Sequence, residues 1–94
     1  MIEFSRTYEF ENEFGAWKFK VETGEHPTRY GNGMLLVITP IAYPEHFNSY
    51  DLTEQFDIRY NNIRSTDDIH ELVMHVLEQS YGVTEADYND IKED

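Results

Sequence analysis

Two histidines, His70 and His75, lie close to Glu71, and zinc-dependent hydrolases build their sites from these residue types. In the metalloprotease helix motif the two histidines are four residues apart, so both project from one face of the helix. Here they are five residues apart, and on a helix the two rings would point in directions roughly 140° apart. We therefore expect no metal site in this segment, and we assign no metal or other cofactor to the chain.

Other residues with chemical potential also lack the neighbours that their chemistry requires. Asp87 and Asp90 resemble part of a calcium loop, but the loop glycine and the terminal acidic ligand are absent at the required spacing. The glycines at 31 and 33 are not followed by the Lys-Ser/Thr pair of a phosphate-binding loop. Carboxylate pairs are numerous, yet spacing alone selects none for acid–base catalysis. We therefore expect a protein that is not an enzyme.

Negative charge is the property that the sequence has in excess. The 94 residues include 19 Asp and Glu against 7 Lys and Arg, which gives a formal net charge of −12. A field of this sign repels nucleic acid and anionic membranes and attracts basic protein surfaces. Cysteine is absent, and no apolar run is long enough to span a membrane. We expect a single cytoplasmic domain that binds neither nucleic acid directly nor a membrane.

The elements that position these residues can be predicted from periodicity. Residues 2–11 and 16–23 alternate between apolar and polar side chains, which indicates two half-buried strands. A tight turn between them fixes one register that satisfies both faces of the hairpin. The predicted pairs are Phe10 with Trp17 and Tyr8 with Phe19 on the core face, and Glu9 with Lys18 and Thr7 with Lys20 on the other face.

Two further strands and a long loop follow. Residues 34–39 form a continuous apolar run that predicts a central strand buried on both faces, and Pro40 should end it. Residues 56–60 alternate again and predict a fourth strand. The segment 24–33 is rich in glycine and proline, so we expect a loop there.

From residue 65 the apolar period changes to that of a helix. Ser65 and Asp68 can form a capping box at its start, and Gly82 can end it. Thr84 can cap a second, short helix. The predicted fold is α+β: a small, mostly antiparallel sheet of about four strands, with a C-terminal amphipathic helix and a short following helix packed on one face. The predicted apolar stripe of the main helix consists of Ile69, Leu72, Val73, Val76, Leu77 and Ser80.

The acidic residues are concentrated where these helices are expected. Residues 65–94 hold nine acids and one lysine, and the lysine lies beyond residue 91. An exposed helix face usually mixes lysine with glutamate, so this repulsion is uncompensated and a basic partner would neutralise it. The alternative is that the acids only keep the protein soluble and complement the helix dipole. The candidate partner-binding ridge consists of Asp67, Asp68, Glu71, Met74, Glu78, Glu85, Asp87 and Asp90.

The loop predicted at residues 24–33 is a second candidate site. It contains His26, Arg29 and Tyr30, which are residue types that often anchor protein interfaces. The alternative is a loop that only connects two strands.

On the acids of the ridge, the chain resembles the small acidic inhibitors that bacteriophages encode against host defences, including anti-CRISPR proteins and DNA mimics. The resemblance implies a protein that occupies the nucleic-acid channel or motif-reading site of a nuclease, with carboxylates where phosphates would lie. Bacterial immunity proteins that neutralise nuclease toxins have the same electrostatic character. The expected partner is therefore a basic protein, such as a nuclease or another nucleic-acid-binding protein in the host cell.

A different class of function is a structural or assembly protein. In that case apolar contacts or an exposed sheet edge would join two copies into a homodimer, and the charge would serve solubility.

Overall fold

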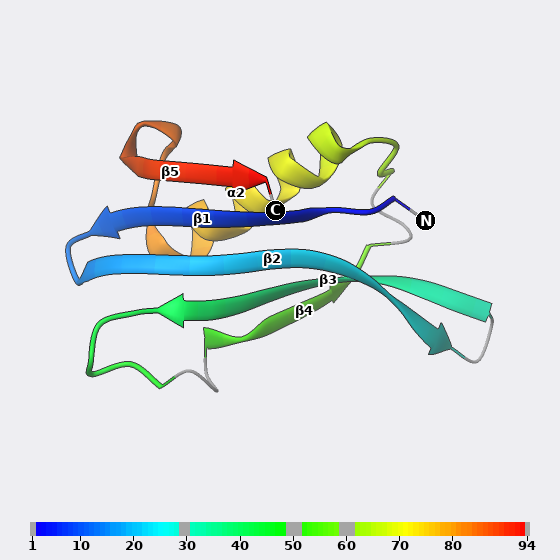
Figure 1. Cartoon of the computed structure of the whole chain (residues 1–94), viewed down its shortest axis with the longest axis horizontal. Coiled ribbons are helices and arrows are strands. Elements are labelled where there is room, and N and C mark those ends of the chain that lie inside the picture. Colours follow the sequence, from blue (N-terminus) through cyan, green and yellow to red (C-terminus); the bar gives the residue numbers. More distant parts are fainter. Residues whose placement is uncertain (1, 29–30, 49–51, 59–61, 94) are drawn as a thin grey trace.

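The protein folds into a five-stranded antiparallel sheet that a helix covers on one face (Figure 1). The structure is a computed structural model and describes residues 2–28, 31–48, 52–58 and 62–93. The strand order is β4-β3-β2-β1-β5, and every neighbouring pair is antiparallel. The predicted α+β class and antiparallel sheet are confirmed. The elements are β1 (Ser5–Asn12), β2 (Gly15–Thr28), β3 (Gly31–Ala42), β4 (Glu54–Asp57), α2 (Thr66–Tyr81), the 3-10 turn η1 (Glu85–Asp87) and β5 (Tyr88–Glu93).

The predicted β1–β2 hairpin is confirmed in its register. The strands join through the two residues 13 and 14, and Gly15 follows with a φ of +132°, a conformation that L side chains rarely adopt. Because side chains alternate between faces, the register places the aromatic residues on the covered face and the charged ones on the open face. The observed pairs are Phe10–Trp17, Tyr8–Phe19, Glu9–Lys18 and Thr7–Lys20.

The prediction of a loop at residues 24–33 is wrong. β2 continues to Thr28 and pairs with β3 without interruption down to Gly31, so these residues extend a two-stranded ribbon. β1 begins at Ser5, opposite Glu22, and no other described strand pairs with that side of β2 at Pro27, so the missing amide hydrogen of Pro27 removes no bond to a neighbouring strand there.

The prediction that Pro40 ends the third strand is also wrong. β3 runs on to Ala42, and its register with β2 shifts at this place. β4 pairs only with residues 35–38, so Pro40 lies where a missing amide hydrogen removes no bond to β4. Burial is one-sided: Leu36 is fully buried, whereas its neighbour Val37 is half-buried on the open face, because α2 covers one face only.

A fifth strand replaces the predicted second helix. The capping box at Thr84 and Asp87 does form, but it starts only η1. The chain then extends as β5 and pairs with β1, with Ile91 opposite Tyr8. The two ends of the chain thus lie side by side in the sheet (Figure 1). The fourth strand is also displaced from its prediction, since β4 ends at Asp57.

Helix α2 begins and ends as predicted. Ser65 and Asp68 form the capping box, and Gly82 has the left-handed φ of 71°. Ile69 and two further residues of the stripe are fully buried, but Ser80 is exposed, which corrects its assignment to the apolar stripe. The helix packs against the sheet over one hydrophobic core, in which the sheet supplies most of the aromatic side chains. The buried residues of this core are Phe4, Tyr8, Phe10, Trp17, Phe19, Val21, Leu36, Ile38, Leu52, Ile58, Ile69, Val73, Leu77 and Val83.

Candidate functional site

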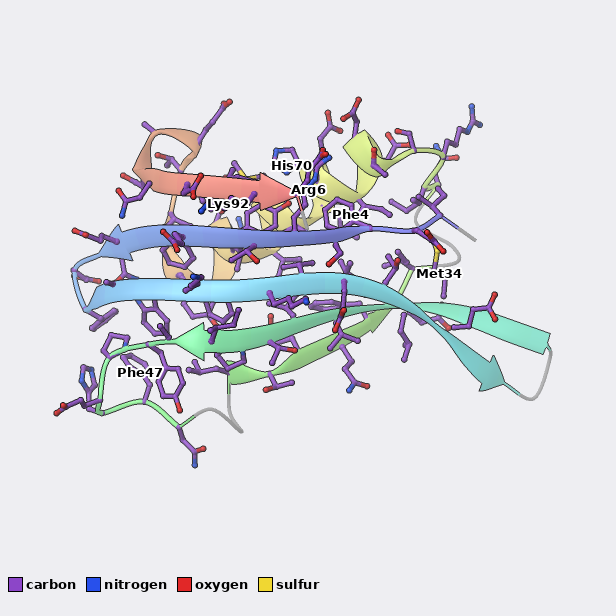
Figure 2. The ribbon with its side chains drawn as sticks, viewed as in Figure 1. Phe4, Arg6, Met34, Phe47, His70 and Lys92 are labelled. Carbon is purple, nitrogen blue, oxygen red and sulfur yellow. The ribbon has the colours of Figure 1, made fainter. Side chains whose placement is uncertain are left out.

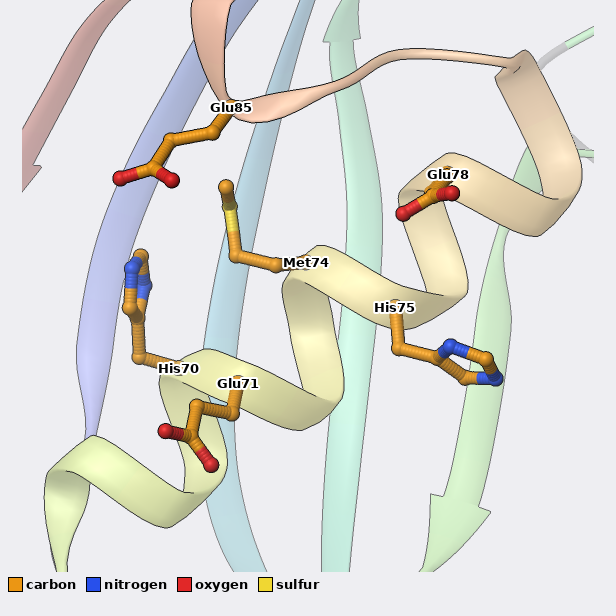
Figure 3. Close-up of a pocket in the computed structure, with 6 residues that line it drawn as sticks. All are labelled: His70, Glu71, Met74, His75, Glu78 and Glu85. Carbon is orange, nitrogen blue, oxygen red and sulfur yellow. The ribbon is translucent and has the colours of Figure 1, made fainter.

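The exposed side of α2 contains a shallow depression of about 410 Å³, lined almost entirely by charged or polar side chains (Figure 3). Glu71 and Glu78 are two helical turns apart on α2, and Glu85 reaches over from η1. Met74 lies between them and also packs against the core. We call this the acidic depression; its lining residues are His70, Glu71, Met74, His75, Glu78 and Glu85.

Four residues of the predicted ridge, Glu71, Met74, Glu78 and Glu85, therefore come together. The others do not line the depression. Asp68 accepts hydrogen bonds from the backbone N–H groups of Arg64 (2.8 Å) and Ser65 (3.0 Å), so it holds the start of α2.

The remaining predicted acids have separate surroundings. Asp87 accepts a hydrogen bond from the backbone N–H of Thr84 at 2.8 Å and thereby holds η1. Asp90 lies on β5, where its carboxylate is 3.4 Å from the Lys92 ammonium. Asp67 is exposed in the first turn of α2. A ridge over two helices is thus replaced by a depression between one helix and a 3-10 turn.

The carboxylates of the depression are not neutralised by neighbours. Helix α2 contains no lysine or arginine. In the described part of the chain, the ion pairs that involve lysine or arginine do not include Glu71, Glu78 or Glu85. Like charges so arranged repel one another, and a cation entering from solvent would relieve that repulsion.

His70 does not supply the missing positive charge at neutral pH. Partial burial and the nearby Arg6 guanidinium lower the pKa of His70 below its ordinary value, and this outweighs the opposite effect of Asp67, Glu71 and Glu85. The ring is therefore neutral at pH 7.

A hydrogen bond anchors His70 to the core. The Tyr8 hydroxyl and His70 Nδ1 are 2.8 Å apart, and the two rings stack with centroids 5.8 Å apart. Burial raises the pKa of Tyr8 to about 12, so its hydroxyl stays protonated. From the sequence, His70 resembles only a metal ligand, and its contact with Tyr8 is not predicted. Its position directly after the buried Ile69 was the available signal that one side of the ring faces the sheet.

The two histidines point to different sides of α2, in keeping with their spacing (Figure 3). Among the residues that the structure describes, no three His, Asp or Glu side chains lie close enough together to hold a metal ion.

The candidate loop residues do not contribute to the depression as far as they are described. His26 lies on β2, opposite Gly33 of β3. Arg29 and Tyr30 lie outside the described residues.

The open face of the sheet differs from α2 in its charge balance. All three lysines of the chain are in strand positions on this face: Lys18, Lys20 and Lys92. The Lys18 ammonium is 3.1 Å from the Glu9 carboxylate, and Lys92 is paired with Asp90. Glu9 and Asp90 lie opposite one another on this face, and each of the two carboxylates has a lysine ammonium beside it.

In the described ranges, no helix is long and apolar enough to cross a membrane. Comparison with protein-family models, with curated proteins and with solved structures found no match to this chain.

Proposed function

We propose that this protein is an inhibitor that binds a basic, nucleic-acid-handling partner protein through the acidic depression. The proposal depends on one local observation: Glu71, Glu78 and Glu85 line one depression, and none of the three forms an ion pair with lysine or arginine among the described residues, in a molecule of net charge −12. Surfaces that bind nucleic acid are rich in Lys and Arg, and these are the groups that such a depression attracts.

The mechanism has two steps. The field of the whole protein first steers the partner's basic groove toward the acidic side, which raises the association rate at low ionic strength. The carboxylates then take the positions that phosphates occupy in the groove. Half-buried Met74 at the centre of the depression offers an apolar surface that excludes water from the contact.

The alternative function, a homodimer formed through a sheet edge, has less support. β4 is only four residues long, and β5 carries Asp90, Lys92 and Glu93 on the other edge. Short edge strands and charged edge residues are devices that prevent pairing between sheets.

Affinity capture from a bacterial lysate at low salt tests the proposed function. We expect a retained basic protein that a short nucleic-acid duplex displaces, because duplex and inhibitor compete for one groove. A rising salt gradient should release the same protein. A retained protein that resists both salt and excess duplex would contradict nucleic-acid mimicry. Capture of only a second copy of this chain would favour the assembly function.

A further inference from the structure

An aromatic side chain stands exposed at the tip of the β1–β2 turn. Phe14 is 53% exposed, and no large apolar side chain in the described ranges is more exposed. Its ring lies edge-on to Phe47 at 5.7 Å and near His46 at 6.5 Å. Figure 2 shows Phe47 at the same end of the sheet as this turn. We call Phe14, His46 and Phe47 the turn patch.

The turn patch is held in place from beneath. Asn12 Oδ1 accepts hydrogen bonds from the Phe14 backbone N–H (2.9 Å) and from Trp17 Nε1 (2.8 Å). Asn12 Nδ2 donates to the carbonyl oxygen of Tyr81, the last residue of α2, at 3.2 Å. The Phe47 ring packs against Trp17 with centroids 4.8 Å apart. Side chains fixed in this way lose little conformational entropy when a partner binds.

The segments that carry the patch are acidic. Residues 11–15 and 43–48 contain Glu11, Glu13 and Glu45, all exposed, and neither lysine nor arginine. Aromatic rings next to carboxylates match a guanidinium group, which is planar, stacks on rings and donates several hydrogen bonds to carboxylates. An ammonium group is more strongly hydrated and gains less from the rings. Charge and shape together therefore favour arginine.

We infer that the turn patch binds an arginine side chain of the basic partner, with the guanidinium against Phe14 and within reach of the neighbouring glutamates. This inference rests on the proposed function, because it adds a second contact with the same partner at the end of the molecule where α2 terminates.

Nuclear magnetic resonance with a triarginine peptide tests the inference. Trp17 is the only tryptophan, so its indole N–H gives one unambiguous signal directly beneath the patch. We expect saturable shifts of this signal and of the Phe14 amide, and weaker binding of trilysine. Phe14→Ala should weaken triarginine binding about fivefold. The matched control is Ile91→Ala, which removes another exposed apolar side chain and should leave binding unchanged.

A second variant tests the charges. Glu13→Gln combined with Glu45→Gln keeps the rings and should also weaken triarginine binding. Undiminished binding by Phe14→Ala would overturn the inference. Shifts confined to the amides of Glu71 and Glu78 would overturn it too, while supporting the acidic depression. Shifts confined to the turn patch would keep this inference and contradict the proposed function.

Discussion

The open face of the sheet and the exposed side of α2 carry charge in different ways. On the sheet, the register of β1 with β2 places Lys18 opposite Glu9, and Lys92 pairs with Asp90 two residues away on the same face of β5. On the helix side, Glu71, Glu78 and Glu85 line one depression, and none of them forms an ion pair with lysine among the described residues.

Net charge alone therefore does not locate an interaction surface. The sheet uses its lysines to neutralise its own acids, which stabilises the fold modestly. The three glutamates of the acidic depression form no ion pair with lysine or arginine in the described chain, although lysine in exchange for one of them would ease the repulsion. A surface of this kind is what binding to a basic partner requires.

The largest effect on stability is expected from a substitution in the core between the sheet and α2. The Phe10 ring contacts Trp17 and Phe19 on the sheet, Tyr81 on α2 and Tyr88 on β5, with centroids no more than 6.2 Å away. Phe10→Ala should therefore lower the free energy of unfolding by about 3–5 kcal/mol in urea titrations. A decrease of less than about 1 kcal/mol in the free energy of unfolding would mean that the sheet and α2 do not share one core.

Removing the carboxylate of Asp68, which caps α2, should lower stability more than removing that of Glu71, which forms no ion pair with the described residues. Asp68→Ala removes the acceptor of two backbone N–H groups and should cost about 0.5–2 kcal/mol. Glu71→Ala should change stability by no more than about 0.5 kcal/mol, since its carboxylate makes no ion pair with the described residues. Thermal unfolding of both variants measures the difference. Equal losses would show that the two acids have the same structural role.

The bond between Tyr8 and His70 links the acidic depression to the core. Tyr8→Phe should cost about 0.5–1.5 kcal/mol, as expected for one hydrogen bond. Because the pKa of His70 is lowered in the folded state, the unfolded chain binds more protons below about pH 6.5. Stability should therefore fall as the pH drops through this value.

His70→Gln should flatten that part of the stability profile. Identical profiles for the wild type and His70→Gln would contradict a lowered pKa at this residue.

The smallest effect is expected on the open face. A double-mutant cycle with Glu9→Gln and Lys18→Gln should give a coupling energy of about 0.2–1 kcal/mol at low salt. The coupling should approach zero at high salt, because both side chains are partly exposed. A coupling energy that does not decrease with salt would mean that Glu9 and Lys18 do not interact mainly through their charges.

The elements with local signals were predictable from the sequence. The β1–β2 register follows from alternation on both sides of one turn, and the limits of α2 follow from Ser65 and Gly82. β5 was missed because Thr84 and Asp87 form the same capping box in a 3-10 turn as in a helix. Its partner β1 is at the other end of the chain, and no local pattern reports so distant a pairing.

The candidate site was predictable in part, for the same reason. Glu71 and Glu78 share a helix face whose orientation the apolar stripe determines. Glu85 joins them only because η1 turns back over α2, which the sequence does not indicate. Asp90 was placed on the same surface as these acids, but the register of β5 puts it beside Glu9 on the open face.

Two variants of equal net charge distinguish binding by the acidic depression from binding by net charge. Glu71→Lys with Glu78→Lys changes the acidic depression, and Glu22→Lys with Glu25→Lys changes exposed acids on β2; each pair moves the net charge from −12 to −8, because every Glu→Lys adds two charges. Binding of a decalysine peptide is measured by calorimetry at low and high salt. We predict that the first variant loses about tenfold or more in affinity at low salt and that the second stays within about threefold of the wild type. Equal losses in both variants would contradict the account, because binding would then depend on net charge and not on the acidic depression.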